Sequence, residues 1–177
     1  MPNPFELDIK AIRRRAREHM KLGPVTRANT SDRERVLAVL NEALATEIVC
    51  ALRYKSHAYA ARGPSGEVAA QELVAHAAEE QAHADMLADR IDQLGGVPDL
   101  NPATLAVRSH TEYVGGDTLK ALLIEDLVAE RVAIETYTEI VRWLGDTDPT
   151  TKRLFEIILA KEEEHADDMR RLLERLG

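Results

Sequence analysis

The residues best suited to chemistry form a pattern that occurs twice along the chain. Each copy has a single glutamate and then a Glu-x-x-His sequence, 33 residues later in the first copy and 32 in the second. The copies consist of Glu47, Glu80 and His83, and of Glu130, Glu162 and His165. Glu and His three positions apart lie on one face of an α-helix, where they can bind one metal ion together. The pattern therefore predicts a metal centre of four carboxylates and two imidazoles.

Charge and ligand chemistry indicate which metal such a centre would hold. Glu47 and Glu130 lie among apolar residues, so their carboxylates are expected to be buried. A buried carboxylate without compensation costs several kcal/mol, and four of them need two divalent cations for neutrality. Oxygen ligands with two nitrogens favour iron or manganese over metals that prefer thiolates. We predict two iron ions per subunit, at a site that manganese or zinc could also occupy.

A solvated helix face is the alternative interpretation of any single Glu-x-x-His sequence. Glutamate-rich helices contain this spacing by chance, and Glu79, Glu163 and Glu164 are interpreted as surface residues of that kind. The repetition argues against chance for the six residues above, because each copy pairs its Glu-x-x-His with a glutamate on another segment. A tyrosine also follows the single glutamate by seven positions in both copies, as Tyr54 and Tyr137.

Four long segments with apolar residues at helical spacing must position these ligands. We expect helices over residues 31–61, 67–94, 117–144 and 148–176. The signals that bound them are a capping box at Ser31 and Glu34, a break at 62–66, a glycine stop at Gly95 and Gly96, and an N-cap with proline at 148–149. Each predicted helix carries one single glutamate or one Glu-x-x-His sequence.

Helices of this length are stable only when they pack side by side. Short links join the first to the second and the third to the fourth, which predicts two antiparallel hairpins. The link at 95–116 is long enough to run the length of the bundle, so the second and third helices can be parallel. The predicted fold is all-α: a four-helix bundle with one long crossover at 31–177, after an N-terminal extension at 1–30 that holds a short basic helix at about 8–21.

Composition and charge disfavour several other classes of protein. Aromatic residues make up 4% and charged residues 31% of the chain, which suits long amphipathic helices rather than a β-sandwich. Cys50 is the single cysteine, so an internal disulfide or a cysteine metal cluster is excluded. We expect a cytoplasmic protein without a membrane span or signal peptide. The net charge of −8 disfavours nucleic acid as the main partner and favours cations.

With these motifs the sequence resembles the ferritin-like superfamily and, within it, the bacterioferritins. The similar motifs are Glu47 with Tyr54, Glu80-x-x-His83, Asp126-Leu-Val-Ala-Glu130, Lys161-Glu-Glu-Glu-His165 and Gly95-Gly-Val-Pro-Asp-Leu100. The resemblance covers about residues 31–176. It implies that Glu47 and His83 are terminal ligands of one iron ion, that Glu130 and His165 are those of the other, and that Glu80 and Glu162 bridge the two ions.

The resemblance also implies roles around the centre. Tyr54 matches a tyrosine that can supply an electron during oxidation, with a hydrogen-bonded core tyrosine as the equal alternative; Tyr137 is its internal mirror. Asp126 is a candidate acceptor for the outer N–H of a ligand histidine, with a surface carboxylate as the alternative. The remaining histidines, among them His57 and His76, are interpreted as structural or surface residues.

Two departures from bacterioferritin bear on assembly. Gln81 stands where bacterioferritins have the haem-binding methionine, so no haem is predicted. Only 12 residues follow His165, too few for the short fifth helix of 24-subunit ferritins. With its extra N-terminal helix, the chain more closely resembles dodecameric Dps-like mini-ferritins with a di-iron site inside each subunit. A homo-oligomeric cage is expected, with a dodecamer favoured over a 24-mer.

The function that the resemblance implies is iron storage and detoxification. Fe(II) would be oxidised by O2 or H2O2 at a di-iron ferroxidase centre, and Fe(III) would be stored as mineral in the cage. The alternative is a di-metal peroxidase or oxidase on a smaller oligomer, similar to rubrerythrin or manganese catalase. A third class, DNA protection through the basic residues at 10–21, is less favoured than a packed helix with a solvated basic face.

Overall fold

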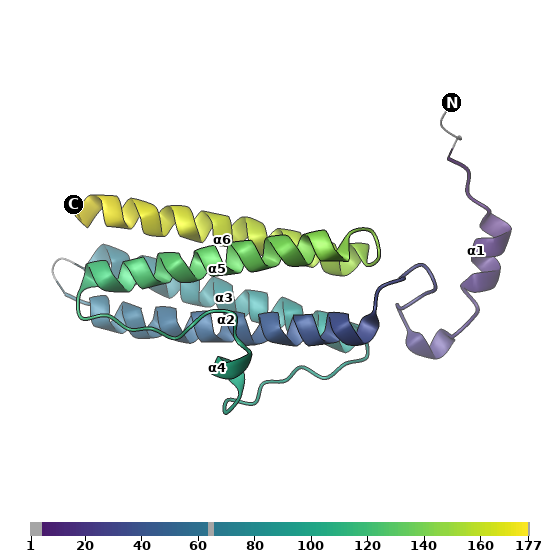
Figure 1. Ribbon diagram of the computed structural model, residues 1–177, viewed down its shortest axis with the longest axis horizontal. Helices are drawn as coiled ribbons and strands as arrows, with labels where there is room; N and C mark the ends of the chain where they lie inside the picture. The colour runs from purple at the N-terminus through teal and green to yellow at the C-terminus, as the bar shows by residue number, and fades with distance from the viewer. Residues whose placement is uncertain (1–4, 64–65, 177) are drawn as a thin grey trace.

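Four long helices, arranged as two antiparallel hairpins, form the body of the protein. The computed structural model describes residues 5–63 and 66–176. The elements are α1 (Ile9–Arg15), a 3-10 helix η1 (Met20–Leu22), α2 (Arg33–Ala61), α3 (Glu67–Gln93), α4 (Leu105–Arg108), α5 (Leu119–Leu144) and α6 (Pro149–Leu176). Figure 1 shows α2, α3, α5 and α6 side by side, with α3 and α5 running in the same direction. The described residues contain no strand, and the all-α bundle with one long crossover is confirmed.

The ends of the helices follow local capping chemistry, with corrections to the predicted starts of α2 and α5. Asp32, rather than Ser31, caps α2 by accepting from the backbone N–H of Arg35 at 3.2 Å. The Ser31 hydroxyl instead donates to Asn29 at 2.6 Å, and a carboxylate is the better partner for the positive end of a helix. Thr118 caps α5, so this helix begins two residues after the predicted start.

The basic N-terminal helix is shorter than predicted. α1 ends at Arg15, and His19 adopts a φ of 52°, a left-handed conformation through which a right-handed helix cannot continue. No residue of α1 is buried, and Figure 1 shows the helix apart from the bundle, beyond the first turn of α2.

The connections between the long helices agree with the predicted hairpins. α2 ends at Ala61 and α3 begins at Glu67; Pro64 and Ser65 of the predicted break lie outside the described residues. Gly95, with a φ of 73°, follows α3, as the glycine stop requires. The crossover passes along α2, where α4 packs Leu105 against Ala45 and Val49. Within residues 5–63 and 66–176, none of the helices has the length and apolar character of a membrane span.

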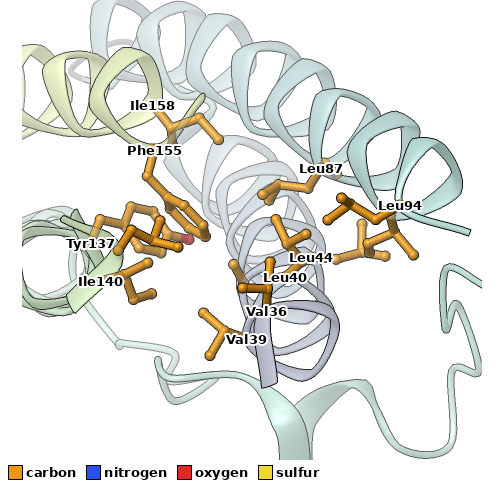
Figure 2. Packing of buried hydrophobic residues seen from close by; sticks show 14 of the residues in the cluster. Val36, Val39, Leu40, Leu44, Leu87, Leu94, Tyr137, Ile140, Phe155 and Ile158 are labelled. Carbon is orange, nitrogen blue, oxygen red and sulfur yellow. The ribbon is translucent and has the colours of Figure 1, made fainter. Parts of the chain in front are cut away.

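Apart from the small cluster under α4, the apolar core between the four long helices forms two clusters. The first, drawn in Figure 2, joins all four long helices around the fully buried side chains Leu40, Leu87, Tyr137 and Phe155. The second joins the same helices at the other end of the bundle around Leu73, Leu123 and Met169. The sequence order on each helix leaves a layer between the two clusters, and this layer holds the predicted metal ligands.

A buried ion pair connects the end of α3 to the start of α6. Arg90 donates to both carboxylate oxygens of Asp148 at 3.0 and 3.1 Å and to the Thr151 hydroxyl at 2.9 Å. Asp148 also accepts from the backbone N–H of Thr151 at 3.1 Å, as the N-cap predicted for this helix. The side chain of Asp148 is therefore both a helix cap and the counter-ion of a buried guanidinium.

We predict that Asp148→Ala lowers the free energy of unfolding far more than Asp32→Ala does. Loss of Asp148 leaves Arg90 buried without its counter-ion, a cost of about 3–5 kcal/mol. Asp32 caps α2 at an exposed position without a described ion pair, so its loss costs about 1 kcal/mol. Urea unfolding at equal protein concentration measures both, and equal effects would show that the buried ion pair does not add to the cap.

Candidate metal centre

The six predicted ligands meet in the layer between the two apolar clusters. Glu47 lies on α2 and Glu130 on α5. The two Glu-x-x-His pairs lie on the other helices, Glu80 and His83 on α3 and Glu162 and His165 on α6. All six are buried, the most exposed being His83 at 4%. Their ligand atoms form two groups, each within 4.8 Å: Glu47, Glu80, His83 and Glu162, and Glu80, Glu130, Glu162 and His165. Because Glu80 and Glu162 belong to both groups, the arrangement is that of two adjacent cation positions with two shared carboxylates.

The histidines turn the same ring nitrogen toward the carboxylates. His83 Nδ1 lies 3.0 Å from one oxygen each of Glu47 and Glu162. His165 Nδ1 lies 3.0 Å from Glu80 and 3.5 Å from Glu162. Glu162 Oε1 is buried, and its 3.0 Å contact with His83 Nδ1 lacks hydrogen-bond geometry. A buried carboxylate oxygen without a well-aligned hydrogen-bond donor is suited to binding a cation.

The two predicted tyrosines bind carboxylates of the opposite hairpin. The Tyr54 hydroxyl on α2 donates to Glu130 on α5, and the Tyr137 hydroxyl on α5 donates to Glu47 on α2. Both rings are fully buried. Each single glutamate is thus oriented by the tyrosine of the other copy, so the repeated sequence becomes a reciprocal arrangement in space.

Burial and mutual repulsion favour the protonated form of two of the four carboxylates, Glu80 and Glu130. Burial, followed by the charge of Glu162, raises the pKa of Glu80 and of Glu130 well above the usual range. Burial alone would lower the pKa of His83, but its contacts with Glu162 and Glu47 outweigh burial and raise the pKa to about 10. Contacts with Glu162 likewise raise the pKa of His165 against the effect of burial. Without a metal ion, the cluster balances its charge with protons.

The outer nitrogen of one ligand histidine has a partner that the sequence interpretation missed. Glu79 accepts from His165 Nε2 at 2.6 Å, although its own side chain is 45% exposed. The prediction that Glu79 is only a surface residue is therefore wrong. Glu79 directly precedes the ligand Glu80, which places it at the edge of the ligand layer. Its position next to a predicted ligand could have indicated this role, but the segment is rich in glutamate and the position did not stand out.

Asp126 does not have the role that the sequence predicted for it. Its carboxylate contacts no ligand histidine and instead accepts from Arg53 Nε at 3.2 Å and pairs with His57 Nδ1 at 2.8 Å. The alternative of a surface carboxylate is also wrong, because Asp126 is fully buried. Asp126 lies one turn before Glu130, where α5 faces α2, and on α2 the nearest polar side chains are those of Arg53 and His57.

This buried network attaches the crossover to the bundle. Arg53 donates to the carbonyl oxygen of Glu112 at 3.1 Å, and His57 Nε2 donates to that of Val114 at 2.9 Å. His57 is thus a structural residue, as expected. Cys50 is buried beside the same segment, and burial raises its pKa to about 12, so the thiol stays protonated.

The chain matches a known protein family over most of its length. The Ferritin-like domain family matches residues 37–177. The bacterioferritin of Desulfovibrio desulfuricans is 31% identical over 140 residues, which are 77% of this chain and 74% of that protein. The DNA protection during starvation protein of Pyrococcus furiosus is 33% identical over 138 residues, or 76% of this chain and 74% of the relative.

Solved structures show the same fold. The bacterioferritin-related protein of Bacteroides fragilis, described as a dodecameric thioferritin, superimposes with a TM-score of 0.79 at 32% identity over 83% of this chain and 89% of its own. Dps from Thermosynechococcus elongatus has a TM-score of 0.72 at 24% identity over 79% of this chain and 90% of its own, which shows the fold alone. The family match, the curated relatives and the bundle together place this chain in the ferritin-like family.

Proposed function

We propose that this protein oxidises Fe(II) at the centre formed by the six buried ligands and stores the product as ferric mineral. The observation that carries the proposal is the pair of ligand groups that share Glu80 and Glu162. Four carboxylates offer −4, which two divalent ions neutralise, and mixed oxygen and imidazole ligands suit iron. Similarity to bacterioferritins supports iron as the substrate.

In the proposed reaction each residue has a position set by the geometry. Glu47 with His83 would hold one Fe(II), Glu130 with His165 the other, and Glu80 with Glu162 would contact both. Two Fe(II) ions then lose one electron each, which reduces H2O2 to two waters or O2 to H2O2 with uptake of two protons. Tyr54 and Tyr137 orient the single glutamates, while the apolar clusters on both sides keep bulk water out of the layer.

The storage half of the proposal requires an assembly with an interior. Similarity to a dodecameric bacterioferritin-related protein supports a homo-oligomeric cage, with a dodecamer favoured over a 24-mer.

The absence of haem also remains a prediction. Gln81, at the position of the haem-binding methionine of bacterioferritins, is exposed and donates to Asp85 at 3.1 Å. A cytoplasmic location, the division into an extension at 1–30 and a bundle at 31–177, and DNA binding through the exposed basic helix α1 are likewise predictions.

We predict that Glu162→Gln lowers the rate of Fe(II) oxidation to that of Fe(II) in buffer. Glu162 belongs to both ligand groups, so one substitution weakens both positions. The matched control is Glu163→Gln, which removes the neighbouring carboxylate on the exposed side of α6 and should retain the wild-type rate. Ferric absorbance after mixing with air or H2O2 measures the rate.

The same samples test storage. A native mass of a closed cage, together with accumulation of ferric mineral beyond the two ions of the centre, is expected for wild type. Oxidation by a dimer or tetramer without mineral would overturn storage and favour the peroxidase or oxidase alternative.

Tyr54→Phe and Tyr137→Phe are predicted to weaken metal binding by similar factors. Each removes one donor to a buried ligand carboxylate, a loss that typically costs about 10–100-fold in metal affinity. Co(II) titration measures the affinities without oxidation. If Tyr54→Phe slows oxidation at saturating Fe(II) and Tyr137→Phe does not, Tyr54 does more than orient Glu130. That result would assign electron supply to Tyr54.

Metal binding is predicted to release protons and to strengthen as the pH rises. The pKa values of Glu80, Glu130, His83 and His165 are raised, so these groups hold protons near neutral pH that a metal ion must displace. Between about pH 6 and 8, affinity for Co(II) should increase by about tenfold per pH unit for each proton released. Calorimetry in buffers of different ionisation enthalpy counts the protons; an affinity independent of pH would contradict the prediction.

A further inference from the structure

A separate group of ligand-type side chains lies beside the centre, between α3 and α6. It consists of Glu72, His76 and Asp168, whose ligand atoms lie within 4.8 Å of one another. None of the three belongs to the six residues of the dinuclear centre. The side chain of His76 is 3% exposed, whereas those of Glu72 and Asp168 are 42% and 37% exposed. The group therefore has a buried imidazole on its inner side and two solvent-facing carboxylates on its outer side.

The spacing within this group fits a coordinated ion better than direct hydrogen bonds. His76 Nε2 lies 3.5 Å from Glu72 Oε1 and also 3.5 Å from Asp168 Oδ2. An N–H···O bond is normally about 2.7–3.2 Å long. Ligand atoms at about 2.1 Å from a tetrahedral ion lie about 3.4 Å apart. His76 Nδ1 is buried without a partner among the described residues, so hydrogen bonding does not explain why this imidazole is buried here.

The position of His76 connects the group to the dinuclear centre. Its ring stacks on that of the predicted ligand His165, with centroids 4.1 Å apart and planes at 21°. Tyr54 contacts the His76 ring edge-on at 5.4 Å. His76 is therefore a buried neighbour of the ligand layer rather than a surface residue, and the His165 ring lies directly against it.

The outer side of the group is open to solvent. A pocket of about 90 Å³ is lined by Glu72 and Asp168 and, further along α6, by Arg171 and Arg175. Arg171 pairs with Asp167 at 2.5 Å, so one of the two guanidinium charges in this pocket is already compensated. A cation can reach Glu72 and Asp168 from this pocket. Bound between the two carboxylates, it would offset the repulsion between their negative charges.

We propose that Glu72, His76 and Asp168 form a third site for a divalent transition-metal ion, which holds Fe(II) at the solvent side of the dinuclear centre. One imidazole nitrogen and two carboxylate oxygens favour Fe(II), Co(II) or Zn(II) over Mg(II) and Ca(II), and water can complete the coordination. Binding of the ion stands on these three residues alone; its role as a holding position rests on the proposed ferroxidase function.

Counting Co(II) ions per subunit in the assembled protein tests the site. The Glu72→Gln/Asp168→Asn double variant should bind one ion fewer than wild type, and His76→Phe, which keeps a ring for stacking, should lose the same ion. The control Asp89→Asn/Glu163→Gln removes equal charge at exposed positions on the same two helices and should bind as many ions as wild type. Zinc anomalous scattering from crystals locates each ion.

The outcomes separate this proposal from that of the dinuclear centre. Glu80→Gln/Glu162→Gln should lose the two central ions and retain the third, whatever the fate of ferroxidase activity. If Glu72→Gln/Asp168→Asn binds as many Co(II) ions as wild type, or zinc is absent from the Glu72 group, the third site is refuted while the dinuclear centre stands. If only the third ion is bound, the proposed function fails and the third site is supported.

Discussion

Four carboxylates buried in one layer of a helical bundle are the constraint on which the rest of this structure depends. Burying even one uncompensated charge costs several kcal/mol, so the layer must be neutralised by protons or by cations. The fold accommodates it by separating two apolar clusters, one around Phe155 and one around Leu73, that supply the stabilising burial. These clusters can hold the shape of the bundle while protons of the central layer give way to the metal ions of the proposed function.

The internal repeat gives this layer its symmetry. Each hairpin contributes one single glutamate, one shared glutamate and one histidine, and neither hairpin completes a ligand group alone. The tyrosine of one hairpin donates to the single glutamate of the other, so docking of the hairpins and assembly of the centre are the same event. A ligand set divided in this way makes the geometry of the site a property of the whole bundle.

A second buried polar network fixes how the hairpins are connected. Arg53 and His57 use Asp126 to link α2 to α5 and donate to carbonyl groups of the crossover. These contacts give hydrogen-bond donors to two carbonyl groups of the crossover where it lies on the bundle. Glu79 and His76 lie at the opposite side of the centre, toward α6, where exposed carboxylates give cations a charged approach to the ligand layer.

Sequence patterns alone predict the four long helices, the crossover and the six residues that the structure brings together. Helical periodicity and the i, i+3 spacing of Glu and His are local properties of the sequence. Their repetition in two copies distinguishes the ligands from the many other glutamates of the chain. Contacts between elements could not be read in this way. Whether Asp126 faces a ligand histidine or Arg53, and whether Glu79 and His76 are surface residues or neighbours of the centre, depends on the rotation of each helix about its axis. Only packing decides that rotation, because a helix face becomes a site when another helix covers it.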